Sequence, residues 1–444
     1  MFRAFICHKN VHKIPRYKKK PLDFLDYVDN HRKTIYIKFI IKNKGLNMKN
    51  YQKMTFLSLL IITSMQAEAS KKFDIDKTRW LSVGAGLRTS FQTQEDAAPN
   101  KTGWNNDFNI DNARLYVNGQ LHQYIKIEFN TDCPSCSNGG DIQVLDAIGK
   151  FEVTPMMNLW VGRHLVPAER REMSGPFYSA IYNAFSTGTP SDPAHFNNRF
   201  KSDGTSAGVE GRDDGATFWG AAFEGHFQYA VGFFRGLNGG ANTNDNILYA
   251  QRFAYNFWKV ERNPGYYTSG TYFGRDGDIL TLAVSNQYQE KGAGTITDAG
   301  DFRGTAVDFL MEKSLPDDNG VVTFNGEYKN YDITNGYSMD SRIAGGGLGV
   351  FEGNATDVSG MYLFPHKLGI GHFQPYARYV DVMPTSSASR NVYEAGLNYV
   401  INGHNAKVSL SYQYGDLLTK GQNYTPTANG DKVNAMNVNF QWQI

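Results

Sequence analysis

The residues of this sequence that could do chemistry are, above all, basic side chains between Leu165 and Asp213. Four of them are Arg170, Arg171, Arg199 and Lys201. Arg or Lys side chains that border a narrow aqueous path can replace part of the hydration shell of an anion and still release it. The alternative is that Glu169 and Glu172 neutralise the Arg pair in a solvated loop.

Other motifs give no sign of catalysis or of a metal site. Cys133-Pro134-Ser135-Cys136 could form a small disulfide ring or stay a free pair, because residues 70–444 lack the second such pair that a four-ligand metal site needs. The seven His residues after residue 69 have no metal-binding spacing, and no Gly-x-Ser-x-Gly motif is present. The Gly-rich run 345–349 lacks the Lys-Ser/Thr ending of a phosphate loop. We therefore expect no enzyme activity, no cofactor and no metal.

The segment 48–69 is typical of a cleaved secretory signal peptide. Lys49 and Lys53 precede an apolar run at 54–65, and Ala67-Glu68-Ala69 forms a small-x-small cleavage site. The apolar run is too short to cross a membrane as a helix. Because signal peptides stand at the N-terminus, we interpret the basic stretch 1–47 as a start-site artefact, with a genuine basic extension as the alternative.

Removing this leader reverses the sign of the net charge. The chain has 45 Lys and Arg against 43 Asp and Glu, and residues 1–69 hold 14 and 4 of these. The remainder has 31 basic and 39 acidic residues, a net charge of −8. A basic surface for nucleic acid is therefore not expected.

From Leu81 onward, apolar and polar residues alternate with the period of two that is typical of β-strands. At the end of the chain, an apolar set alternates with an amide set: Met436, Val438, Phe440, Trp442 and Ile444 against Asn437, Asn439, Gln441 and Gln443. One face suits lipid and the other suits water. The chain is 41% hydrophobic and 14% aromatic, but no uncharged run reaches the ~20 apolar residues of a membrane-spanning helix.

The alternation predicts sixteen strands whose ends are approximate. They lie at 81–92, 108–121, 124–131, 142–153, 158–164, 214–223, 227–236, 247–257, 278–288, 304–313, 321–331, 358–365, 372–382, 391–400, 407–415 and 432–444. Long and short connections alternate between them, as in outer-membrane barrels. An open sheet edge in hydrocarbon would leave backbone groups unpaired, at a cost of several kcal/mol each.

We therefore predict an all-β fold: a closed antiparallel transmembrane β-barrel of about 16 strands, formed by residues 70–444, with short periplasmic turns and long external loops. The connection from Trp258 to Gly277 is the exception, because it is long where a short turn is due, and it could hide a mispaired strand. A secreted soluble β-sandwich is the alternative fold.

Strand parity predicts which charged side chains face the lumen of this barrel. Five basic residues stand opposite the apolar stripe: Arg88, Arg114, Lys126, Arg252 and Arg378. Acidic residues share that side: Glu128, Asp146, Glu327 and Glu394. A lumen lined by both signs of charge can produce an electric field across the channel as readily as it can provide a row of anion-binding sites.

Several stretches resemble the phosphate-selective porin O and P family, and the similarity spans most of residues 80–444. They are Val161-Gly162-Arg163 with Pro167 and Glu169, Arg212-Asp213-Asp214-Gly215 with Trp219-Gly220, 227–232 with Gly236, 375–379 and 396–407. The chain departs from the family at Arg163, where Gln is frequent, and at Ile444, where many outer-membrane barrels end in Phe.

The resemblance implies an outer-membrane porin of a Gram-negative cell, in contact with outer-membrane lipid. It would be a homotrimer whose water-filled channel lets small hydrophilic solutes diffuse passively, with a preference for phosphate-like anions. The third external loop, 165–213, would fold into the lumen, and Arg170 and Arg171, with Arg163 at its base, would form the anion-attracting constriction. A non-conducting structural or adhesive barrel and a barrel enzyme are the alternatives.

The leader analysis predicts that the mature protein begins at Ser70, because Ala67 and Ala69 are the small pair correctly placed behind the apolar run. N-terminal sequencing of protein purified from outer membranes checks this. A mature N-terminus before Met48 would show that both the cleavage site and the start-site interpretation are wrong.

Overall fold

The computed structural model describes residues 71–133, 136–138, 141–185, 211–238, 240–294, 296–334, 352–385, 389–417, 419–420, 425–426 and 432–444. The predicted signal peptide at 48–69 and the stretch 1–47 lie outside the described residues. So do Arg199, Lys201 and the Gly-rich run 345–349. The division into leader and mature chain therefore stays a prediction.

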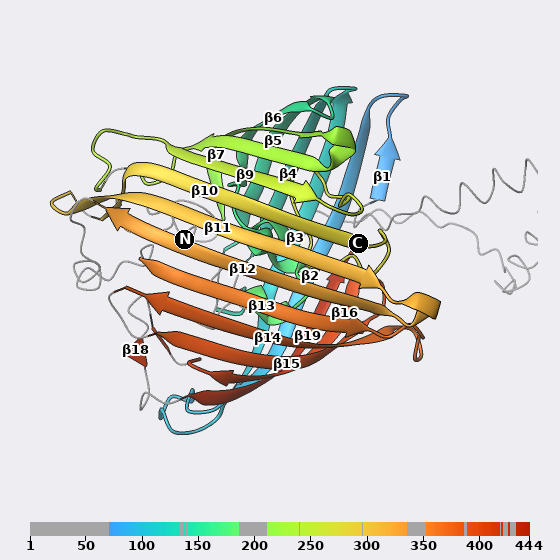
Figure 1. The fold of residues 1–444 in the computed structure, drawn as a ribbon, viewed down its shortest axis with the longest axis vertical. Coiled ribbons are helices and arrows are strands. Elements are labelled where there is room, and N and C mark those ends of the chain that lie inside the picture. Colours follow the sequence, from blue (N-terminus) through green and yellow to red (C-terminus); the bar gives the residue numbers. More distant parts are fainter. Residues whose placement is uncertain are drawn as a thin grey trace, which may run out of the picture. The chain divides into compact units, whose positions relative to one another are not determined.

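Sixteen antiparallel strands form a closed barrel, which confirms the predicted fold class (Figure 1). Each strand pairs with the next along the chain, and pairing of the last strand with the first closes the ring. In chain order they are β2 (Trp80–Gln94), β3 (Asn105–His122), β4 (Ile125–Asp132), β5 (Gln143–Thr154), β6 (Met157–Leu165), β7 (Arg212–Ala222), β8 (Phe227–Phe234), β9 (Leu248–Asn256), β10 (Ile279–Gly294), β11 (Ala299–Ser314), β12 (Val321–Thr334), β13 (Gly353–Leu363), β14 (His372–Pro384), β15 (Arg390–Val400), β16 (Ala406–Gly415) and β19 (Val433–Gln443).

Short elements lie in the connections. They are β1 (Lys71–Asp74), which pairs with the start of β2, η1 (Cys136–Asn138), α3 (Arg170–Tyr178), η2 (Tyr182–Phe185), η4 (Phe223–Gly225), η5 (Pro316–Asp318), β17 (Thr419–Lys420) and β18 (Thr425–Pro426). Among the described residues, no helix has the length and apolar character to cross a membrane. Cys133 and Cys136 form a disulfide in the connection between β4 and β5.

The two ends of the barrel differ. At one end the turns are short, as between β3 and β4 and between β5 and β6, and we call it the short-turn end. The connections after β2, β4, β6, β8, β12 and β16 lie at the other end, the long-loop end. This is the asymmetry that the sequence predicts, in which the short-turn end corresponds to the periplasm.

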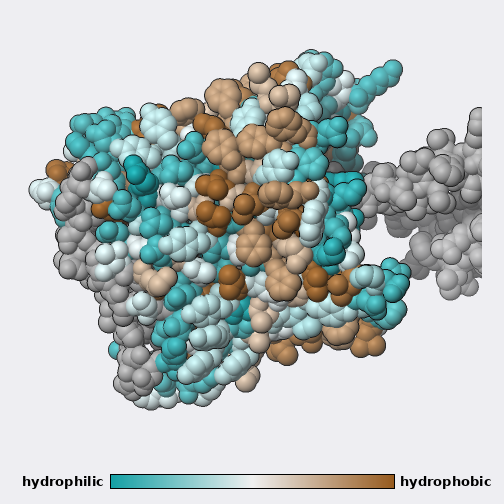
Figure 2. Space-filling model, in the orientation of Figure 1, coloured by the Kyte–Doolittle hydropathy of each residue, from teal (hydrophilic) through white to brown (hydrophobic). Residues whose placement is uncertain are grey.

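The wall has an apolar outer face and a polar inner face. In β19, Asn439 is 1% and Gln441 0% exposed, whereas Met436 and Trp442 point outward and are 51% and 44% exposed. On the visible side of the molecule, apolar side chains gather in a band across the strands, between hydrophilic residues toward the two strand ends (Figure 2). The alternation read from the sequence is therefore the division between lipid face and lumen face.

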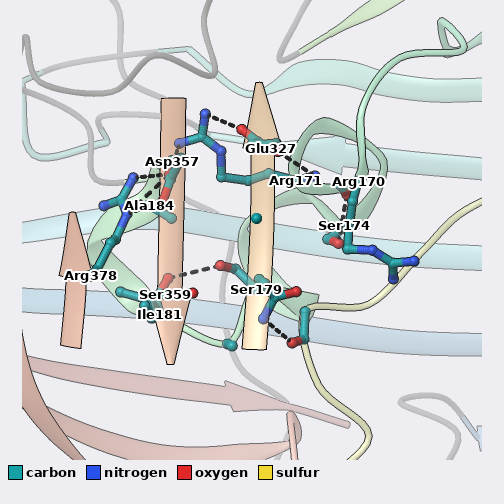
Figure 3. A pocket seen from close by; sticks show the side chains of 14 residues that line it. Arg170, Arg171, Ser174, Ser179, Ile181, Ala184, Glu327, Asp357, Ser359 and Arg378 are labelled. Atoms are coloured by element: carbon teal, nitrogen blue, oxygen red, sulfur yellow. Dashed lines mark hydrogen bonds and ion pairs between the residues drawn. The ribbon is translucent and has the colours of Figure 1, made fainter. Parts of the chain in front are cut away.

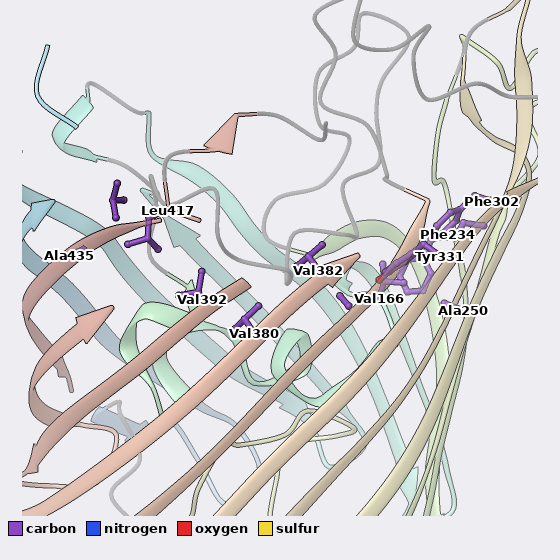
Figure 4. Packing of buried hydrophobic residues seen from close by; sticks show 13 residues of the cluster. Val166, Phe234, Ala250, Phe302, Tyr331, Val380, Val382, Val392, Leu417 and Ala435 are labelled. Atoms are coloured by element: carbon purple, nitrogen blue, oxygen red, sulfur yellow. The ribbon is translucent and has the colours of Figure 1, made fainter. Parts of the chain in front are cut away.

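Not every inward-facing side chain is polar. Near the long-loop end, buried apolar residues from eight of the strands and from two connections form a cluster: Val166, Phe234, Leu248, Ala250, Phe302, Tyr331, Ala355, Val380, Val382, Val392, Leu417, Val433 and Ala435 (Figure 4). Several charged lumen residues, such as Arg252, Asp308 and Glu327, lie nearer the middle of their strands. The interior thus combines an apolar cluster near one end with ionic groups.

The long connection Trp258 to Gly277 does not hide a mispaired strand. The suggestion that it could is therefore wrong. β9 pairs directly with β10, in a register from Tyr249 opposite Tyr288 to Asn256 opposite Thr281. The pairing continues beyond the strands, because the amide of Lys259 donates to the carbonyl of Asp278 at 3.0 Å. The extra residues form a separate segment inside the barrel.

The outward parity of β16 generates a test. Leu410 lies in the middle of β16, points outward and is 55% exposed. The change Leu410→Arg should cost about 2–4 kcal/mol if this position is at the bilayer midplane. Heat-modifiable migration of outer-membrane protein in gels measures the folded fraction. Leu410→Phe should leave that fraction unchanged, and an equal folded fraction for the Arg variant would refute the lipid-facing assignment.

Candidate functional site

Residues 166–185, the described part of the connection directly after β6, lie within the barrel and reach strands on several sides of the lumen. The amide of Arg170 donates to Asp308 of β11 at 3.1 Å. Farther along, the Asn183 side chain donates to Glu394 of β15 at 2.9 Å and to Ser411 of β16 at 2.7 Å. The carbonyl of Tyr182 accepts from Arg88 of β2 at 2.7 Å.

The helix in this segment is short and bent because of its sequence. Gly175 has φ of 61° inside α3, a left-handed conformation that favours glycine, and Pro176 follows it without a backbone donor. The Ser174 hydroxyl donates to the carbonyl of Arg170 at 2.8 Å and stabilises the turn before the bend. This bend directs Arg170 and Arg171 and the following residues to different parts of the wall.

Arg171 of α3 and Arg378 of β14 belong to one network of ion pairs with acids on β12, β13 and β15. Figure 3 shows both arginines with Glu327 and Asp357. Arg171 binds Glu327 and Asp357, each at 2.9 Å. Arg378 binds the same Asp357 at 2.7 Å and Glu394 at 3.4 Å. Asp357 therefore lies between two guanidinium groups, one from the loop and one from the wall.

Lys329 of β12 joins one further acid, Glu169, to Glu327. Its ammonium group lies 2.5 Å from Glu169 and 3.3 Å from Glu327, and its side chain is 1% exposed. Burial, together with the neighbouring Glu169 carboxylate, raises the pKa of Glu172 to about 8. Arg170 is 3% and Arg171 8% exposed, so the Arg pair does not lie in a solvated part of the loop.

Arg170 belongs to a second group of charges. Its guanidinium donates to both oxygens of Glu261, at 2.8 and 2.6 Å, and lies 3.5 Å from Asp308. Arg252 of β9 also binds Asp308, at 3.0 Å through Nη2, and donates to the carbonyl of Ala168 at 2.9 Å. Burial alone would raise the pKa of the Glu261 carboxyl, but the Arg170 guanidinium outweighs it and lowers that pKa to about 2.

The other predicted lumen cations face inward, but they belong to neither of these two groups of ion pairs. Arg88 donates to Asn112 at 2.8 Å and lies over the ring of Tyr182, 3.8 Å from its centroid. Arg114 binds Asp132 at 2.7 Å. Lys126 binds Glu152 at 2.5 Å near the short-turn end. The structure thus brings Arg171 and Arg378 together, and Arg170 with Arg252, but not all eight predicted residues.

Arg163 does not face the lumen, so its predicted place at the constriction is wrong. On β6, Trp160 and His164 point inward and are both 0% exposed, which turns Arg163 to the outer face. There it donates to both oxygens of Asp214, at 2.7 and 3.0 Å, and Arg235 joins the same carboxylate at 3.3 Å.

A partly open cavity lies between α3, the residues after it and the wall (Figure 3). Its lining combines charged, hydroxyl, amide and small apolar groups: Arg170, Arg171, Ser174, Ser179, Ala180, Ile181, Ala184, Gly270, Asn325, Gly326, Glu327, Asp357, Ser359 and Arg378. Guanidinium and carboxylate groups are thus close together on it. The cavity can offer polar contacts to water and to small hydrophilic molecules.

Among the residues that the structure describes, the ion pairs around this cavity contain more acids than cations. The five cations are Arg170, Arg171, Arg252, Lys329 and Arg378, and the six acids are Glu169, Glu261, Asp308, Glu327, Asp357 and Glu394. Sequence analysis missed Lys329, Asp308, Asp357 and Glu261. Strand parity could have found the three strand residues, for example Lys329, two residues after Glu327, and the unexpected length of the connection after β9 was the signal for Glu261.

No family model matches the chain, and neither does any curated protein. Among solved structures, the anion-selective porin from Comamonas acidovorans aligns with 12% identity over 82% of this chain and 100% of that chain, with a TM-score of 0.54. OprB of Pseudomonas putida aligns with 9% identity over 83% and 95%, with a TM-score of 0.52. These similarities show the fold: the barrel matches those of Gram-negative outer-membrane proteins.

The different surroundings of two strand arginines give a test of the lumen assignment. Arg378→Ala removes a partner from buried carboxylates and should cost about 3 kcal/mol or more, because it leaves them less compensated. The matched change Arg163→Ala breaks a pair whose side chains are 27% and 41% exposed and should cost at most about 1 kcal/mol. Urea unfolding of the purified barrels in lipid measures both. Equal losses would contradict the outward position of Arg163.

Proposed function

We propose that this protein is an outer-membrane porin through which small hydrophilic solutes diffuse passively. The observation that carries the proposal is the polar, ion-paired cavity between the loop after β6 and strands β12 to β14, within a closed barrel of sixteen strands. A barrel of this size has a lumen wide enough for water. Charged groups at the cavity can exchange contacts with water for contacts with a passing solute.

A preference for phosphate-like anions is the narrower part of the proposal. It is supported by the family resemblance and by the guanidinium groups of Arg171 and Arg378 on the cavity. The six acids against five cations among the described ion pairs oppose it. Two unit charges about 4 Å apart interact by about 4 kcal/mol at an effective dielectric of 20, so each pairing greatly reduces the attraction left for an anion. We therefore expect a weak preference that falls as salt rises.

The remaining partners follow from the same proposal. Export through the predicted signal peptide would deliver the chain to the outer membrane of a Gram-negative cell, where the apolar outer face contacts lipid. We propose a homotrimer, as the family resemblance implies.

The second candidate is a non-conducting structural or adhesive barrel. Its specific support is that two segments, one after β6 and one after β9, lie within the lumen and contact each other. Single-channel recording of the purified protein in a planar bilayer distinguishes the candidates. Discrete conductance steps support the porin, and their absence with folded protein supports the non-conducting barrel.

A pair of neighbouring residues on β13 makes this recording specific for the cavity. Ser359 borders the cavity, whereas Val358 points outward and is 39% exposed. Ser359→Trp should reduce the single-channel conductance by about half or more, because an indole group fills part of a narrow path. Val358→Trp should leave it unchanged. A normal conductance in the Ser359 variant would place the ion path elsewhere.

A further inference from the structure

The segment Phe257–Asp278, between β9 and β10, enters the barrel from the short-turn end and follows α3. The amide of Thr268 donates to the carbonyl of Met173 at 3.3 Å, and the amide of Gly270 donates to that of Tyr178 at 2.9 Å. The Thr268 hydroxyl also lies 2.9 Å from the hydroxyl of Ser174. Backbone contacts therefore join this segment to the middle and to the C-terminal end of the helix.

The opposite side of the segment is fixed to the barrel wall. Glu312 of β11, 0% exposed, accepts from the Thr271 hydroxyl at 2.7 Å and from the amides of Tyr272 and Gly274 at 3.0 and 2.7 Å. The side chain of Asn325 on β12 donates to the carbonyl of Gly270 at 2.8 Å. Gly270 also borders the cavity, so the segment forms part of its lining.

The same segment provides a carboxylate, Glu261, that forms an ion pair with Arg170. Glu261 receives two hydrogen bonds from the Arg170 guanidinium and a third from the Tyr272 hydroxyl at 2.5 Å. In the close view of the cavity, the Arg170 side chain points away from Arg171 and Arg378 (Figure 3). Arg170 is therefore directed away from the other arginines of the cavity, and Glu261 compensates its charge.

We propose that Phe257–Asp278 is the second half of the channel constriction: it narrows the path from the short-turn end, and its Glu261 cancels the charge of Arg170. The inference rests on the proposed porin function. On this inference, a connection on the periplasmic side takes part in solute selection, because it affects both the width and the charge of the channel.

Charge variants test the role of Glu261. Glu261→Gln keeps the shape of the side chain and should raise the anion-to-cation permeability ratio about twofold or more at ~0.1 M salt, since it leaves the charge of Arg170 less compensated. Arg170→Gln should shift the ratio in the opposite direction, and the double variant should return it close to that of the unchanged protein. Zero-current potentials in a salt gradient measure this. An unchanged potential in conducting Glu261→Gln channels would overturn the charge role.

A shortened segment tests the role in width. The hydrogen bond from Lys259 to Asp278 extends the hairpin, so residues 260–277 can be replaced by an Asn-Gly turn. The shortened barrel should have a clearly larger conductance and pass larger neutral sugars in liposome swelling. Unchanged conductance and size limit would overturn the proposal.

A disulfide tests the contact even if the shortened barrel does not fold. Ser174→Cys with Thr268→Cys replaces two hydroxyls whose oxygens are 2.9 Å apart, and the single variants are the controls. We expect the bond to form in the folded barrel and to leave conductance unchanged, as for a fixed part of the constriction. A folded barrel without the bond, or a large change in conductance when it forms, would overturn the inference. If the unchanged protein does not conduct, the porin proposal fails, while bond formation still tests the contact.

Discussion

The structure depends on one constraint: in a bilayer, every backbone amide and carbonyl of the wall needs a partner within the protein. Pairing of β19 with β2 supplies the last set of partners and closes the sheet. Closure fixes strand parity, so one side chain in two must face lipid and the next must face the interior. The apolar stripe of β19 and its row of buried amides are two consequences of the same hydrogen bonds.

Closure also explains why the interior is full of ion pairs. A charge that faces inward is removed from bulk water on one side, and it needs compensation when a segment covers it. Arg171 meets Glu327 and Asp357 of the wall, and the segment after β9 brings Glu261 to Arg170. These pairs position both lumen segments, so the charges that line the lumen and the space left between the segments arise from the same contacts.

Much of the fold could be predicted from the sequence because its signals are local. The period of two and the turn lengths located all sixteen strands, and residues opposite the apolar stripe, such as Arg378 and Glu394, were correctly assigned to the interior. Arg163 was misplaced because its position beside a loop was given more weight than the inward parity of Trp160 and His164.

The remaining contacts join residues far apart in the sequence, and no local pattern encodes them. Arg170 and Glu261 are 91 positions apart, so their pairing follows only from where two connections meet inside the closed wall. A count of basic residues in the loop after β6 suggests an anion-attracting path. The ion pairs in the structure argue against a strongly anion-attracting path, because Arg170 and Arg171 each lie against two carboxylates. The electrostatic character of such a lumen is therefore determined by which acids the wall and the second segment place beside the loop, and less by the composition of the loop itself.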